Sequence, residues 1–133
     1  MLSKFEQLCS AMATKEGWFA PLPNLPRTNN NPGDLRASPL NRLKDKYGFV
    51  QFKTPEEGIA GLYQQMARYA MMGFTIRQVI TAYAPPTGPD GGNNTEKYIS
   101  DVCGWTGLTD STVLWDLFPC VNMYTYKDGP NGQ

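Results

Sequence analysis

The sequence predicts a mainly helical domain, and three observations carry that prediction. Apolar side chains recur every three or four residues in several segments, which is the period of one helix face. Residues that cap helix N-termini precede these segments, and glycine or proline follows them. The 133 residues, 41% of them hydrophobic, are enough to bury one core, so we expect a single domain over residues 1–133.

The first predicted helix begins after Ser3 and ends at Gly17. Ser3 and Glu6 have the spacing of a capping box, and Gly17 is a typical helix stop. An apolar stripe at helical spacing lies between them: Phe5, Leu8, Cys9 and Met12. One more step of four residues leads from Met12 to Glu16. A carboxyl group therefore continues an apolar face.

Residues 20–47 are predicted to be irregular, because they contain five prolines and the turn sequence Asn29–Gly33. A loop of this length inside a domain is often functional. Residues 47–53 are predicted to form a short strand.

Further helices are predicted over residues 55–72, 75–83 and 95–103, each with an N-terminal cap and an apolar stripe. The stripe of the helix over 55–72 consists of Ile59, Leu62, Tyr63, Met66 and Ala70. Gly104 is expected to end the helix over 95–103. A fifth helix is expected to start at Asp110 or Ser111, and the segment after Pro119 is compatible with either a helix or an extended chain.

The composition excludes several classes of function. Twelve basic and twelve acidic side chains cancel, which argues against a nucleic-acid or anionic-lipid partner. Histidine is absent, and this excludes Ser-His-Asp and Cys-His nucleophile systems and most zinc sites. We expect neither a metal nor an organic cofactor, and acid–base chemistry falls to the carboxylates and the other titratable side chains.

The cysteines and the N-terminus indicate where the protein is made. Cys9, Cys103 and Cys120 lack the spacing of a redox or metal motif and are predicted to be apolar packing residues. A Cys103–Cys120 bridge stays open if the protein matures outside the cytosol. Residues 2–13 lack the apolar core of a signal peptide, and no segment has the length of a membrane span. Synthesis in the cytosol and export by another route are therefore expected.

Glu16 is the strongest candidate for a catalytic group. A glutamate on the inward side of a helix end is desolvated, which raises its pKa and keeps a proton available near neutral pH. A general acid that protonates a glycosidic oxygen needs this state. The alternative is a structural ion pair of Glu16 with Arg27, Arg36 or Lys15.

Four segments resemble, in order, phage-type members of the lysozyme and lytic transglycosylase superfamily. They are the helix end over 12–18 with its Glu-Gly pair, the Asn-Asn-Pro-Gly turn within 29–36, the Gly-Phe-Val-Gln-Phe run over 48–52, and the Ala-Tyr segment over 81–86 with the helix start beyond it. Together they span roughly residues 9–103.

The resemblance implies an α+β lysozyme-like fold: a helical domain in which a small strand element near residues 47–52 walls a cleft. It implies cleavage of the β-1,4 bond between N-acetylmuramic acid and N-acetylglucosamine in peptidoglycan glycan strands. We expect a monomer, delivered to the bacterial cell wall by a phage or prophage, with neither nucleic acid nor membrane as a partner. The rival hypothesis is a non-catalytic wall-binding or phage structural module with the same fold.

The resemblance also assigns roles to residues. Glu16 matches the acid, and Tyr83 matches a tyrosine whose hydroxyl reaches the catalytic region. Asp34, beside the glycine turn, is the candidate general base or electrostatic partner. Substrate contacts are assigned to a further set: Asn30, Asn31, Gln51, Phe52 and Tyr98. For the asparagines the alternative role is building the turn, and for Phe52 and Tyr83 it is packing.

Overall fold

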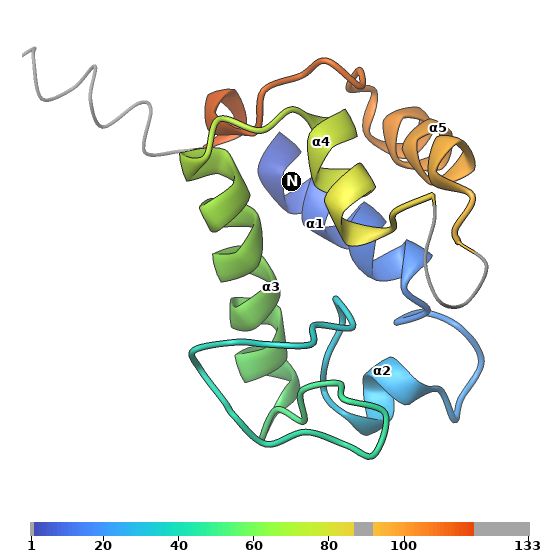
Figure 1. Ribbon diagram of the computed structural model, residues 1–133, viewed down its shortest axis with the longest axis vertical. Helices are drawn as coiled ribbons and strands as arrows, with labels where there is room; N and C mark the ends of the chain where they lie inside the picture. The colour runs from blue at the N-terminus through green and yellow to red at the C-terminus, as the bar shows by residue number, and fades with distance from the viewer. Residues whose placement is uncertain (1, 87–91, 119–133) are drawn as a thin grey trace, which may run out of the picture. The chain divides into compact units, whose positions relative to one another are not determined.

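The protein is mainly helical, as predicted, in a computed structural model that describes residues 2–86 and 92–118 (Figure 1). In chain order the elements are α1 (Lys4–Lys15), α2 (Leu25–Thr28), α3 (Pro55–Met71), α4 (Ile76–Tyr83), α5 (Thr95–Thr106) and the 3₁₀ helix η1 (Leu114–Leu117). The chain divides into two compact units, residues 6–68 and residues 1–5 with 69–133, so the division falls within α1 and within α3. Each unit is described separately.

In the unit of residues 6–68, α1 and α3 bury most of the apolar stripes that the sequence predicts, although Tyr63 is only half-buried. Leu8, Cys9 and Met12 of α1 are buried, as are Leu62 and Met66 of α3. Ile59 is 39% exposed, so its predicted place on the buried face of α3 is wrong. The buried face is instead completed by two glycines, Gly58 and Gly61, whose missing side chains let other chain segments approach the helix closely.

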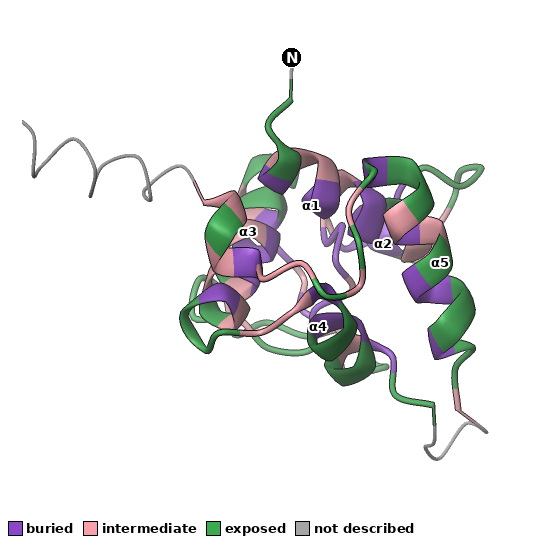
Figure 2. Ribbon diagram, turned by 90° about the horizontal axis from the view of Figure 1, so that it is seen from above, coloured by how far each residue is buried: buried purple, intermediate pink, exposed green. Residues whose placement is uncertain are grey.

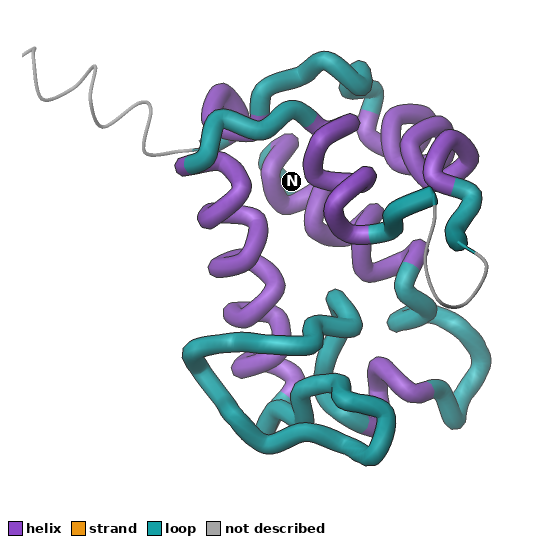
Figure 3. Tube along the Cα trace, in the orientation of Figure 1, coloured by secondary structure: helices purple, strands orange, loops and turns teal. Residues whose placement is uncertain are grey.

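The segment predicted to be irregular contains one short helix, α2. Asn24 caps it by accepting a hydrogen bond from the backbone of Arg27, at 2.9 Å. Pro26 lies in the first turn, where the missing N–H costs nothing because it has no partner within a helix. The prolines of this segment therefore do not exclude a helix, and the sequence prediction missed it. From residue 29 to residue 54 the chain runs as loop (Figure 3).

The strand predicted over residues 47–53 is not formed. Among the described residues it is reduced to a single antiparallel bridge between Lys44 and Val50. The reason is that consecutive residues pair with different segments: the amide of Val50 donates to Leu35 and that of Phe52 donates to Asn29. The side-chain amides of Asn31 and Asn30 donate to the carbonyl oxygens of Val50 and Phe52, respectively. These oxygens are then not available to accept hydrogen bonds from a neighbouring strand.

In the unit of residues 1–5 and 69–118, α4 packs against α5. Thr75 and Gln78 form the predicted capping box of α4. Figure 2 shows that α5 buries one side and exposes the other. The predicted end of this helix at Gly104 is wrong, because α5 continues through Gly104. The C-cap is Gly107, which has a left-handed φ of 75°.

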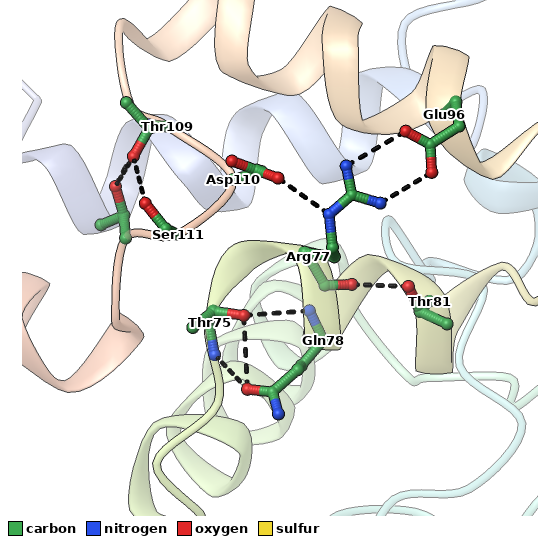
Figure 4. Close-up of polar contacts among 9 residues, drawn as sticks. Thr75, Arg77, Gln78, Thr81, Glu96, Thr109, Asp110 and Ser111 are labelled. Atoms are coloured by element: carbon green, nitrogen blue, oxygen red, sulfur yellow. Dashed lines mark hydrogen bonds and ion pairs between the residues drawn. The ribbon is translucent and has the colours of Figure 1, made fainter.

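The predicted fifth helix is only the single 3₁₀ turn η1. Its N-terminal approach is extended, because Val113 forms an antiparallel bridge with Thr75. Asp110 is also unavailable as a cap, since its carboxylate binds Arg77 at 2.8 Å while Arg77 binds Glu96 at 2.7 Å (Figure 4). This exposed ion-pair cluster ties the beginning of α4 to the beginning of α5 and to the loop before η1.

Within the described residues, no helix combines the length and apolar character needed to cross a lipid bilayer. Cys9 is buried, and burial raises the pKa of its thiol, in keeping with a packing residue. Cys103 is half-buried on α5. Cys120, the other half of the bridge left open by the sequence, lies outside the described residues, as does the segment after Pro119.

Candidate active site

Glu16 is held at the C-terminal end of α1 by a Schellman motif. The amide of Trp18 donates to Ala13 at 3.0 Å and that of Gly17 donates to Thr14 at 3.2 Å. Gly17 has a φ of 97°, which a residue with a side chain adopts only with strain. Glu16 is thus the residue that closes the last turn, and its own amide donates to Met12 at 3.0 Å. Its backbone position is therefore well determined.

Two of the three expected ion-pair partners of Glu16, Arg27 and Arg36, make other contacts. The C-terminus of a helix carries roughly half a negative charge, so an anion there is destabilised. Arg27, one of the three expected ion-pair partners, is engaged elsewhere: its Nε donates to the carbonyl of Trp18 at 2.8 Å and its guanidinium lies 3.8 Å from the indole centroid. Arg36 donates to the carbonyl of Tyr47 at 3.0 Å.

Asp34 is positioned by the turn that the sequence singled out. The amide of Asp34 donates to the carbonyl of Asn31 at 3.2 Å, which closes the turn Asn31–Asp34. Asp34 has a φ of 47°, a left-handed conformation that aspartate and asparagine tolerate better than most residues. The next residue, Leu35, is held on both sides: its amide donates to the Asn31 side chain and its carbonyl accepts from Val50.

The structure brings Glu16 and Asp34 together as a hydrogen-bonded carboxyl pair. Burial raises the pKa of Asp34 to about 6, while the hydrogen bond to Glu16 and the charge of Arg36 act to lower it and the charge of Asp45 adds to the rise. Two carboxyl groups can share a hydrogen bond only if one is protonated.

The pair leaves one acceptor uncommitted. Oδ1 of Asp34 is buried and has no hydrogen-bond partner among the described residues. A buried carboxylate oxygen without a donor is unfavourable. A hydrogen-bond donor from outside the chain would therefore be favoured at this oxygen.

Gln51 is connected to this region through a residue that the sequence analysis missed. Asn29 is buried, and its Nδ2 donates to Asp45 at 2.8 Å while its Oδ1 accepts from Gln51 Nε2 at 3.4 Å. Burial alone would raise the pKa of Asp45, but hydrogen bonds from Asn29 and from the amides of Phe49 and Tyr47 outweigh it and lower the pKa. Asn29 thus links a charged Asp45 to Gln51. The run of three asparagines was the only signal for it.

Asn30, Asn31 and Phe52 have structural contacts: the two asparagines build the turn, and Phe52 packs in the core. Asn31 is fully buried, and its Nδ2 donates to the carbonyls of Leu35 and Val50, both at 3.0 Å. Asn30 donates to the carbonyl of Phe52 at 3.1 Å and has a φ of 52°. Phe52 is 4% exposed. From these positions the three residues build the turn and its support rather than present polar groups to solvent.

Tyr83 and Tyr98 belong to the other unit. Tyr83 is the last residue of α4 and is half-buried. Tyr98 lies on the buried face of α5 with Ile99 and Val102. Glu16 and Asp34 belong to the unit of residues 6–68, as do the other candidate residues of that range: Asn30, Asn31, Gln51 and Phe52.

The raised pKa of Asp34 predicts a specific pH dependence of stability. The folded state holds the Asp34 proton more tightly than the unfolded chain, so this group favours folding below about pH 4, and the benefit is lost as the pH rises through about 6. Asp34→Asn removes this loss, and asparagine tolerates the same left-handed backbone. We expect the variant to be more stable than the parent at pH 7 by about 1 kcal/mol, less than the full shift implies because the group is partly exposed. Urea unfolding at several pH values measures the difference.

The matched control is Asp116→Asn, which removes an exposed carboxyl group. It should leave the slope of stability between pH 4 and pH 6 unchanged. An equal slope in the parent and in Asp34→Asn would show that Asp34 is not desolvated.

No group of three or more acidic or cysteine side chains able to hold a metal ion occurs within residues 2–86 and 92–118. Comparison of the chain with protein-family models, with curated proteins and with solved structures found no match.

Proposed function

We propose that this chain cleaves the glycan strands of peptidoglycan as a lysozyme-like glycosidase, with Glu16 as the general acid. The observation that carries the proposal is the pairing of Glu16, at the C-terminal end of α1, with the Asp34 carboxyl group, whose pKa is raised to about 6 chiefly by burial. The four segments that resemble the lysozyme and lytic transglycosylase superfamily suggest the substrate. The bond cleaved would be the β-1,4 link between N-acetylmuramic acid and N-acetylglucosamine.

In the proposed reaction Glu16 gives its proton to the glycosidic oxygen as the bond to the anomeric carbon breaks. The bonding electrons leave with that oxygen, and positive charge develops on the sugar ring. The helix C-terminus disfavours a charge on Glu16 before the reaction, which keeps the proton in place until the breaking bond makes the glycosidic oxygen basic enough to accept it. The charged Asp34 beside it then offsets the positive charge of the sugar.

The closeness of the two carboxyl groups limits the role of Asp34. Inverting glycosidases separate their carboxyl groups by about 6.5–9.5 Å to admit a water molecule, and retaining enzymes separate them by about 5–5.5 Å. A hydrogen-bonded pair is closer than either. We therefore assign Asp34 to holding the proton on Glu16 and to electrostatic stabilisation, and not to activating a water between the two groups.

Analysis of the products tests the proposal. Purified peptidoglycan is incubated with the protein, and the soluble fragments are identified by mass spectrometry. Release of muropeptides with a reducing N-acetylmuramic acid would indicate hydrolysis. Release of anhydro-muropeptides, each lighter by one water, would indicate capture of the intermediate by the substrate's own 6-hydroxyl. No fragments from a wall that binds the protein would contradict the proposal and favour the non-catalytic module.

The pH profile of cleavage tests the role of Asp34 as a positioning residue. In Asp34→Asn the side-chain amide can donate to a charged Glu16, which favours loss of the Glu16 proton. We therefore expect the alkaline limb of the pH–activity profile, where the rate falls as Glu16 loses its proton, to lie at a lower pH in Asp34→Asn than in the parent. Rates of muropeptide release measured across the pH range give the position of this limb. If the limb does not move, Asp34 does not control the proton of Glu16.

A further inference from the structure

Residues 36–49, which we call the basic loop, are ordered by backbone hydrogen bonds. The amide of Asp45 donates to Phe49 and that of Gln51 donates to Leu43, both at 2.8 Å. Gly48, with a φ of 91°, completes the tight turn between the two sides. The loop therefore presents its side chains from a defined hairpin-like backbone.

The basic loop concentrates positive charge that the composition of the whole chain conceals. It carries four cationic side chains, all exposed: Arg36, Arg42, Lys44 and Lys46. Its single carboxylate, Asp45, is half-buried and turned inward, where it accepts hydrogen bonds from Asn29 and from the amides of Tyr47 and Phe49. The loop thus presents an excess of cations, although the chain as a whole has no net charge.

Two of these cations gather at the tip of the loop around Tyr47. Arg36 donates to the Tyr47 carbonyl at 3.0 Å, and its guanidinium lies 4.3 Å from the ring centroid of Phe49. The ammonium group of Lys46 lies 5.1 Å from the ring centroid of Tyr47. Among the described residues, no cation of the basic loop forms an ion pair with a carboxylate. The charges of Arg42, Lys44 and Lys46 are therefore available to a partner, whereas the charge of Arg36 also acts on Asp34.

The same loop exposes large apolar side chains. Leu40 is 42% exposed, Leu43 is 64% exposed and Tyr47 is 57% exposed. A nucleic acid or an anionic polysaccharide would bind the cations but has no apolar surface to bury an exposed leucine. A lipid bilayer with anionic headgroups binds both kinds of side chain, because basic side chains contact the headgroups while leucine and tyrosine enter the interfacial region.

We propose that the basic loop docks on an anionic lipid surface. This revises the sequence-based expectation that the chain has no membrane partner, under which Arg42, Lys44 and Lys46 form only a short mixed stretch around Asp45 and not a basic stripe. Each basic residue near such a surface strengthens binding by about fivefold, and the contribution weakens as salt screens it. The proposal does not depend on the proposed glycosidase activity.

Vesicle sedimentation tests the proposal. The full chain is mixed with vesicles of equal parts phosphatidylglycerol and phosphatidylcholine, and with vesicles of phosphatidylcholine alone. We expect binding to the anionic vesicles that weakens with added salt, and much weaker binding to the neutral ones. Failure to bind the anionic vesicles at low salt would overturn the proposal.

Three variants separate the contributions. Arg42→Glu changes the charge of the loop by two and should weaken binding to anionic vesicles by about 25-fold, whereas Leu43→Ser should weaken it by about threefold. Arg68→Glu is the matched control, because it makes the same change of charge at an exposed arginine outside the basic loop. Arg68 lies 13 residues after the first residue of α3, which is about 20 Å along the helix.

Equal losses in Arg42→Glu and Arg68→Glu would show that binding follows net charge and not the loop, against the proposal. An unchanged affinity of Leu43→Ser, together with equally tight binding of a single-stranded oligonucleotide, would identify a general polyanion surface instead of a bilayer site. Circular dichroism of each variant confirms that the helices are intact. Cleavage of purified peptidoglycan by the same variants keeps this result separate from the proposed activity.

Discussion

Glu16→Gln is expected to lower the rate of muropeptide release by about 100- to 10,000-fold, the range that general acid catalysis contributes. Glutamine has nearly the same shape and can still hydrogen-bond to Asp34, but it has no proton to give to the glycosidic oxygen. The Schellman motif that closes α1 uses backbone groups only and is unaffected by the change. The loss should therefore appear in activity and not in the unfolding temperature. Loss of turbidity of a cell-wall suspension measures it.

The control for this experiment is Glu56→Gln, which makes the same substitution at an exposed glutamate in the first turn of α3. It should leave the rate within about twofold of the parent, because surface substitutions have small effects. If Glu16→Gln retains the parental rate, Glu16 is not the acid. If the parent itself binds cell walls without releasing fragments, the chain is a binding module.

The helices were the most predictable part of this fold, because each is specified by neighbours in sequence. The capping box of Thr75 and Gln78 and the glycine stop at Gly17 both lie where the local pattern places them. The predictions that failed depend on distant residues. Asp110 does not start a helix, since its carboxylate is bound to Arg77, 33 positions earlier. Residues 47–53 do not form a strand, since their backbone groups are shared among three other segments.

The candidate site was predictable in part for the same reason. Periodicity along α1 leads to Glu16, and the turn chemistry of residues 31–34 marks Asp34 as an exposed or functional position. That these two carboxyl groups meet could not be derived from their spacing. The three consecutive asparagines look alike in the sequence, yet their side chains go to different places. Asn31 supports Leu35 and Val50, whereas Asn29 reaches Asp45 and Gln51.

Gly58→Ala is expected to be strongly destabilising. A Cβ built at Gly58 would lie 1.7 Å from the carbonyl oxygen of Asn30 and 3.0 Å from Pro32. Both atoms belong to the turn that positions Asp34, and a backbone atom cannot rotate away as a side chain can. Either α3 or the turn must move by more than 1 Å. We expect a loss of about 3 kcal/mol or more in the free energy of unfolding, at the upper end of overpacking effects.

Gly104→Ala is the matched control, because it makes the same substitution inside another helix. No atom lies within 4 Å of a Cβ at Gly104, so alanine adds only its helix propensity. We expect it to stabilise the protein by about 0.5–1 kcal/mol. If Gly58→Ala lowers the free energy of unfolding and Gly104→Ala raises it, the destabilisation at Gly58 comes from the close approach of α3 to the Asn30 turn and not from the loss of a glycine as such. A Gly58→Ala protein as stable as its parent would mean that α3 and the turn are not in contact. The support of Asp34 would then need another explanation.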